Sequence, residues 1–206
     1  FASIEAYATY YQGKLKMPDD EFRVFCTRRM AQSAEYSARH RALLAAASRE
    51  RGIVLASHDD ATRAHVAEAV TDGITVAEFP TTLEAAKASR EAGLAILMGG
   101  PNVVRGGSHS GNVSARTLAE NGMLDILSSD YIPFSLIQSA FFLGEVVDRI
   151  SLPQAIAMVT RRPAEAVGLT DRGEIAAGKR ADLVRVRIDE HVPVVRSVWR
   201  GGERVA

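Results

Sequence analysis

Residues 53–60 read IVLASHDD, so an apolar run of four residues stands directly before Ser57, His58, Asp59 and Asp60. A continuous apolar run of this length is typical of a strand buried on both faces, as the strands of a parallel sheet are. In parallel α/β folds, ligands bind at the C-terminal ends of the strands. The stretch therefore predicts a parallel strand that carries polar side chains to a functional edge.

The same pattern recurs further along the chain, with apolar runs at residues 74–77, 94–98 and 124–127. A glycine stands shortly before each run, where it ends the preceding helix. Strands that alternate with helices indicate βα units, which build either a (β/α)₈ barrel or a doubly wound sheet. Because four units are half a barrel and leave open edges, we expect the other half to come from elsewhere.

Helices are predicted between the strands and on both sides of them. The first fifty residues have a helical composition, with Asp19 or Asp20 as the cap of a long helix that Gly52 ends. A capping box of Thr81 and Glu84 is expected to open the helix that ends at Gly93. The remaining helices are expected over residues 61–72, 113–121, 133–150 and 152–161, and short strands over 181–186 and 194–200.

Composition excludes several classes of protein. The chain is 47% hydrophobic and 24% charged, which is typical of a globular protein with a sizeable core. Its 25 Lys and Arg balance 25 Asp and Glu, so neither nucleic-acid nor membrane-surface binding is indicated. A single cysteine, Cys26, excludes an internal disulfide framework and is expected of a cytoplasmic protein. Since the chain begins with Phe1, we expect it to be part of a longer protein.

Polar side chains follow three of the four predicted strands in a way that suits a metal site. They are His58 and Asp59 after the first strand, Glu78 after the second and Asp130 after the fourth. Imidazole and carboxylate groups are ligands of zinc, manganese and iron, and such a metal acidifies water into a nucleophile. Each residue also has a structural interpretation: His58 as an ordinary polar residue, Glu78 as a loop residue, and Asp59 and Asp130 as carboxylates at the start of a helix. For Asp60, a helix cap is the favoured interpretation.

A glycine-rich loop at residues 99–112 is the second cluster. Glycine allows backbone N–H groups to converge on an anion, and Arg105 adds a bidentate partner for phosphate. The phosphate-binding residues predicted here are Arg105, Gly106, Gly107, Ser108, His109, Ser110 and Asn112. The alternative is a flexible surface loop, because the spacing matches no Walker or Rossmann fingerprint. For His40, His65 and His191 we expect surface or packing roles.

Together these residues resemble the amidohydrolase superfamily. The resemblance is carried by His58, by Asp130 and by the tail stretch GEIAAGKRADLV at residues 173–184. Longer motifs are similar to the PhnM-type hydrolases of phosphonate metabolism across essentially the whole chain. These motifs are SHDD at 57–60, EFPTT at 78–82, PN at 101–102, RG at 105–106, SHSGN at 108–112 and LSSDY at 127–131.

The resemblance implies a fold and an activity. The fold is the C-terminal half of a TIM-like barrel over residues 1–168, plus strands of a small β-sandwich over 169–206. The activity is hydrolysis of α-D-ribose 1-methylphosphonate 5-triphosphate to pyrophosphate and the 5-phosphate, with one or two divalent metal ions. His58 would be the fifth-strand ligand, and Asp130 the eighth-strand ligand that takes a proton from the attacking water. Glu78 stands where most superfamily members carry histidine.

Other functions stay open on the sequence. The chain has no His-x-His pair, which the superfamily carries on its first strand. An amidohydrolase acting on an amide, a cyclic ureide or a deaminase substrate is one alternative, and a non-catalytic phosphate-binding module is another. The expected partner is a small phosphorylated substrate, with no nucleic acid and no membrane, and a homodimer is left open.

Overall fold

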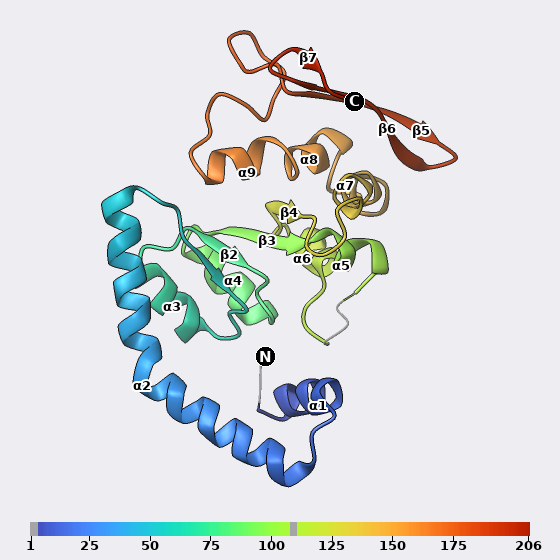
Figure 1. The fold of residues 1–206 in the computed structure, drawn as a ribbon. Helices are drawn as coiled ribbons and strands as arrows, with labels where there is room; N and C mark the ends of the chain where they lie inside the picture. Colours follow the sequence, from blue (N-terminus) through green and yellow to red (C-terminus); the bar gives the residue numbers. More distant parts are fainter. Residues whose placement is uncertain (1–3, 108–110) are drawn as a thin grey trace.

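The computed structural model describes residues 4–107 and 111–206, with a four-stranded parallel sheet at its centre (Figure 1). Its strands lie side by side in chain order, and every pairing is parallel. They are β1 (Ala56–His58), β2 (Val76–Glu78), β3 (Ala95–Gly99) and β4 (Ile126–Ser128). The predicted set of four adjacent parallel strands is therefore confirmed. Each strand begins later than its apolar run, and Ile53 and Val54 before β1 are 56% and 40% exposed.

Helices cover one face of the sheet and bury the core there. Alternate strand residues on this face, among them Ala77, Ile96 and Leu127, pack into a single apolar cluster with residues of the helices. The helices of this cluster are α4 (Leu83–Glu91), α5 (Gly100–Arg105), α6 (Ala115–Glu120), α7 (Ser135–Val146) and α8 (Leu152–Ala157). Helix α3 (Arg63–Thr71) packs on α4 through a separate small cluster of Val66, Ala85 and Ala88. The opposite face carries His58 and Glu78, which occupy paired positions on β1 and β2.

Helix α5 is a departure from the predicted glycine-rich loop. It begins directly after β3, with Pro101 in its first turn, where the missing N–H of proline is tolerated. Gly106 ends it in a left-handed conformation, with a φ of 82°. Residues 100–105 of the loop predicted over residues 99–112 are therefore helical.

The helix caps differ from those predicted by one or two residues. Thr62 caps α3 and Thr82 caps α4, and each hydroxyl accepts a hydrogen bond from the backbone N–H three residues on. Asp60 is therefore not a cap. The predicted capping box is also wrong, because Glu84 instead accepts from the backbone N–H of Arg63 in the neighbouring helix, at 3.0 Å.

The N-terminal helices form an arm beside the sheet (Figure 1). Helix α1 (Ile4–Leu15) is followed by α2 (Asp19–Arg51), which ends at Gly52 as predicted. Pro18 occupies the cap position of α2, so Asp19 and Asp20 lie in its first turn rather than capping it. Among the described residues no helix has the length and apolar character needed to cross a bilayer.

The C-terminal part adds two short helices and an antiparallel ribbon. The helix predicted over residues 152–161 is the shorter α8 (Leu152–Ala157), and α9 (Arg161–Ala166) begins where the predicted helix ends. The ribbon consists of β5 (Leu183–Asp189), β6 (Val192–Arg200) and β7 (Glu203–Arg204). Both predicted tail strands are thus present, and β7 is an additional one.

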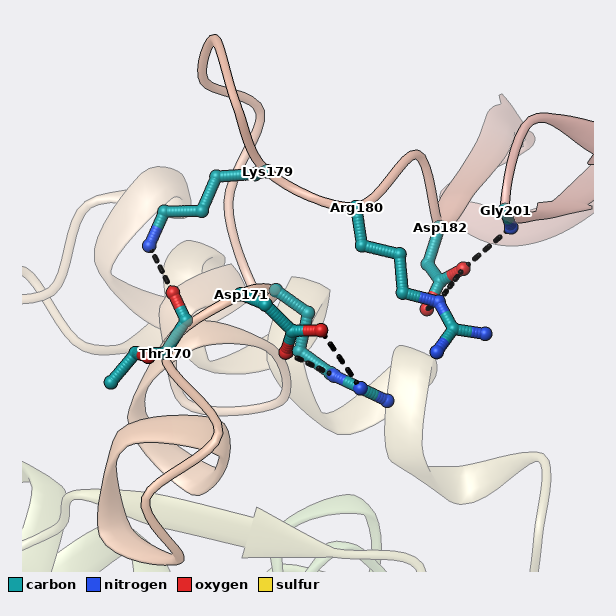
Figure 2. Close-up of polar contacts among 7 residues, drawn as sticks. Thr170, Asp171, Lys179, Arg180, Asp182 and Gly201 are labelled. Atoms are coloured by element: carbon teal, nitrogen blue, oxygen red, sulfur yellow. Dashed lines mark hydrogen bonds and ion pairs between the residues drawn. The ribbon is translucent and has the colours of Figure 1, made fainter.

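The segment that leads into the ribbon is held by polar contacts (Figure 2). Lys179 donates from Nζ to the carbonyl of Thr170 at 2.5 Å, and the Asp182 carboxylate accepts from the backbone N–H of Gly201 at 2.8 Å. That backbone hydrogen bond, together with the Arg180 guanidinium, lowers the pKa of Asp182. The contact joins the start of β5 to the turn after β6.

Candidate active site

A small hollow lies at the C-terminal ends of the strands. It has a volume of about 140 Å³, and Asp59, Phe79, Gly99, Arg105 and Asp130 are among the residues that line it. Asp59, Phe79 and Asp130 follow β1, β2 and β4, whereas Gly99 ends β3 and Arg105 ends α5, so five separate elements converge on the hollow. The volume is smaller than the several hundred Å³ that is usual for a ligand pocket. It suits a phosphate group rather than a whole nucleotide-sized substrate.

Left-handed residues stand where three of the strands end. Asp59, Phe79 and Asp130 have φ values of 62°, 53° and 49°. Aspartate adopts this conformation more readily than phenylalanine, whose bulk makes it an outlier there. Such strain costs on the order of 1–3 kcal/mol per residue and clusters at functional sites. The turns continue the sheet, since the N–H of Asp59 donates to Glu78 and that of Phe79 donates to Leu97.

His58 does not line the hollow itself but contacts Asp59 and Phe79, which do, and its side chain is 58% exposed. Its Nδ1 lies 3.2 Å from Oδ2 of Asp59, and its ring meets the Phe79 ring edge-to-face at a centroid distance of 5.3 Å. Glu78 lies next to it in the strand register, on the same face of the sheet. The predicted His58, Asp59 and Glu78 are thus neighbours at one edge.

Asp130 reaches the hollow from the fourth strand because Gly99 leaves room for it. A Cβ atom at Gly99 would lie 3.0 Å from Oδ2 of Asp130 and 3.5 Å from Cε1 of Phe79. The alternative interpretation of Asp130 as a helix cap is excluded, because Phe134 takes the cap position of α7.

Arg105 also lines the hollow, at the end of α5. Its Nη2 donates to the hydroxyl of Tyr131 at 3.1 Å, and Tyr131 lines the hollow as well. The sequence reasoning assigned no role to Tyr131, although its place directly after Asp130 was a signal. A guanidinium and a phenol thus meet at one side of the hollow.

The described part of the glycine-rich loop is fixed at both ends. The N–H groups of Gly106 and Gly107 donate to the carbonyls of Val103 and Asn102, and these bonds close the end of α5. The Asn102 side chain accepts from the N–H of Ala115 at 2.8 Å. Asn112 and Gly107 line the hollow. The predicted Ser108, His109 and Ser110 lie outside the described residues.

Asp60 and the histidines that were predicted to have surface or packing roles do not line the hollow. Asp60 is 8% exposed, and its carboxylate accepts from the hydroxyl of Ser57 at 2.5 Å. His65 lies in α3, where its Nδ1 accepts from the N–H of Ala61. His40 stacks on Tyr36 in α2, and His191 lies in the turn between β5 and β6. The predicted surface and packing roles of these histidines are consistent with these positions.

A divalent metal fits the kind of donor at this edge but not the number. Imidazole and carboxylate are suitable ligands, and His58, Asp59 and Asp130 offer them. Within residues 4–107 and 111–206, however, no three His, Cys, Asp or Glu side chains are grouped closely enough to hold an ion. Catalytic sites use more protein ligands than the His58–Asp59 pair supplies. The described residues alone therefore do not complete a metal site.

Comparison with known proteins identifies relatives along the whole chain. A model of the Amidohydrolase family matches residues 18–206. The α-D-ribose 1-methylphosphonate 5-triphosphate diphosphatase of Escherichia coli (strain K12) is 53% identical over 100% of this chain and 54% of that protein. The dihydroorotase of Methanopyrus kandleri is 37% identical over 34% of this chain and 20% of that protein. The chain thus spans about half the length, or less, of the curated relatives it matches.

A solved structure has a fold similar to that of this chain. The structure of an amidohydrolase from Thermotoga maritima MSB8 superposes with a TM-score of 0.57 and 24% identity. The match covers 75% of this chain and 44% of that one. At this identity the likeness concerns the fold alone.

Proposed function

This chain belongs to the amidohydrolase family, and from that premise we propose that the protein is a metal-dependent phosphoanhydride hydrolase. The substrate proposed is α-D-ribose 1-methylphosphonate 5-triphosphate, cleaved to the 5-phosphate and pyrophosphate. The observation that carries the proposal is the meeting of Arg105 with Asp130 and Asp59 around one small hollow. The 53% identity to a diphosphatase of that name supports the same substrate.

The metal would be held at the edge formed by His58, Asp59, Glu78 and Asp130, with further ligands from outside the described residues. A divalent cation bound there supplies Lewis acidity, which lowers the pKa of water. Asp130 accepts the proton of the attacking water, because its carboxylate projects over Gly99 into the hollow. Asp59 lies within an ion-pair distance of the His58 Nδ1 and orients the ring.

Arg105 would bind the polyphosphate. Its guanidinium stands at the hollow and carries a fixed charge, so it offsets the negative charge that gathers on the leaving pyrophosphate. Tyr131 holds the guanidinium by the 3.1 Å hydrogen bond, which leaves the other N–H groups for phosphate oxygens. Gly106, Gly107, Ser108, His109, Ser110 and Asn112 form the rest of the proposed phosphate-binding loop.

The proposed fold of the whole protein is a closed TIM-like barrel with a small β-sandwich, to which residues 1–168 and 169–206 contribute. One observation supports the idea of further chain: an apolar groove of about 1190 Å³ lies between α7, α8 and the ribbon β5–β6.

The test is steady-state hydrolysis by the full-length protein of a ribose 5-triphosphate substrate and, in parallel, of a neutral cyclic amide. Arg105→Ala is expected to lower kcat/KM for the triphosphate by about 2 to 4 kcal/mol in transition-state terms. Arg105→Lys should recover only part of this, because lysine keeps the charge and loses the planar fork. Arg116→Ala is the matched control, since Arg116 pairs with Glu120 on the surface of α6.

The amide substrate distinguishes the alternatives. If only the cyclic amide is hydrolysed, the protein is an amidohydrolase that acts on amides. The similarity to dihydroorotase is then the better guide to its substrate. If neither substrate is turned over while the triphosphate binds, the protein is a phosphate-binding module. An Arg105→Ala variant with unchanged triphosphate turnover contradicts the role of the loop.

A further inference from the structure

The turns after β1 and β2 have the same backbone course and different side chains. Thr62 and Thr82, which end the two turns, have φ and ψ of −132° and 160° and of −128° and 158°. Asp59 and Phe79 hold equivalent left-handed positions three residues before them. Aspartate is tolerated in this conformation, whereas phenylalanine is strained there. The second turn thus keeps an unfavourable residue where a favourable one is compatible with the fold.

The Phe79 ring contacts the His58 ring and lies near Gly99. It meets the His58 imidazole at 5.3 Å between centroids, with the rings at 84° to each other. Phe79 Cε1 lies 3.5 Å, and Asp130 Oδ2 3.0 Å, from the point where a Cβ of Gly99 would stand. The ring therefore contacts the imidazole of His58 and shares with the Asp130 carboxylate the space that Gly99 leaves free.

The backbone around Phe79 is held in place. Its N–H donates to the carbonyl of Leu97 at 2.9 Å, and Pro80 behind it is fully buried. A strained residue persists where its surroundings determine its conformation, and such residues are found at sites where geometry is used. The strain therefore places an aromatic ring where an unstrained aspartate would put a third carboxylate.

We propose that Phe79 is a positioning residue that fixes the orientation of the His58 imidazole. The inference rests on the proposed metal site, in which His58 is a ligand. The ring makes no bond to the ion and acts only through the orientation of His58. Loss of the ring is expected to weaken metal binding by about 10- to 100-fold, which is the usual effect of removing a group that orients a ligand.

The test is Zn²⁺ titration of the full-length protein and of the variants Phe79→Leu, Phe79→Gly and Phe79→Tyr. The Leu and Gly variants should both lose Zn²⁺ affinity, and Tyr, which keeps the ring, should retain it. Phe79→Gly also removes the backbone strain, so its Zn²⁺ affinity should fall while its melting temperature changes little. Phe142→Leu, on an exposed part of α7, is the matched control and should bind Zn²⁺ as the wild type does.

A second readout is the NMR spectrum of the His58 ring in the metal-free protein at one pH. The ring protons should show a ring-current shift that disappears in Phe79→Leu and remains in Phe79→Tyr. Unchanged His58 signals and Zn²⁺ affinity in Phe79→Leu would overturn the inference. The variant His58→Ala distinguishes failure of this inference from failure of the proposed metal site. If His58→Ala also leaves Zn²⁺ affinity unchanged, the proposed function is wrong as well.

Discussion

At the scale of single residues, the candidate site depends on small side chains as much as on charged ones. Gly99 and Gly100 are neighbours that make room for different partners. A methyl group at Gly99 would meet the Asp130 carboxylate, whereas one at Gly100 would lie 2.8 Å from Oγ of Ser135 and 3.0 Å from its backbone oxygen. The first glycine gives space to the site and the second to the packing of α7 on α5.

Substitution of these two glycines should separate activity from stability. Gly99 has a φ of −78°, so alanine fits its backbone, and Gly99→Ala is expected to shift Asp130 by a few tenths of an ångström. Turnover should fall by about tenfold or more, since small misplacements of catalytic groups are costly. Gly100→Ala should instead cost about 1–3 kcal/mol of stability through overpacking. Steady-state kinetics and thermal unfolding of both variants check this, and equal effects on both quantities would contradict it.

At the scale of helices and strands, the hydrophobic pattern predicted the elements better than residue types at caps and turns predicted their ends. All four parallel strands were predicted, because a buried strand needs a continuous apolar run and a glycine ends the helix before it. Helix α5 was missed because Gly100-Pro101 has the composition of a loop, although proline is favoured in a first turn. The caps were misassigned because Asp60 and Thr81 are also capping residue types, and only the backbone decides between neighbours.

Only some residues of the candidate site were predicted from the sequence. Asp59, Arg105 and Asp130 were expected at one edge, since the ends of parallel strands meet there, and they line the hollow. Phe79 was not expected to have a role, because a left-handed φ and an edge-to-face contact with His58 leave no pattern in the sequence. Tyr131 was missed because its contact with Arg105 joins two distant elements.

The ribbon β5–β6 should loosen in acid through Asp182. Because the folded state lowers the pKa of this carboxylate, its contribution to stability is present above the unfolded pKa of about 3.9 and is lost as the pH falls through the lower folded value. Trp199, the single tryptophan, lies in β6 and reports on the ribbon. Its fluorescence should change at acid pH in the wild type and less so in Asp182→Asn. Asp189→Asn, at the far end of β5, is the control; an Asp182→Asn curve equal to the wild type would contradict the role.

At the scale of the whole molecule, the sheet is open where the site needs more groups. Among the described residues nothing pairs with the outer edge of β1, and the face with His58 and Glu78 lies opposite the helices. The matched relatives are about twice as long as this chain. We therefore expect the 206-residue chain alone to bind metal weakly and the full-length protein to bind it tightly.

The metal content of purified full-length protein tests the central claim most directly. Elemental analysis should find a divalent metal in the wild type and a large loss in His58→Ala and in Asp130→Ala, because each variant removes a proposed ligand. His65→Ala serves as the control, since His65 is engaged within α3, and it should keep the metal. Wild-type metal content in both His58→Ala and Asp130→Ala would contradict the account.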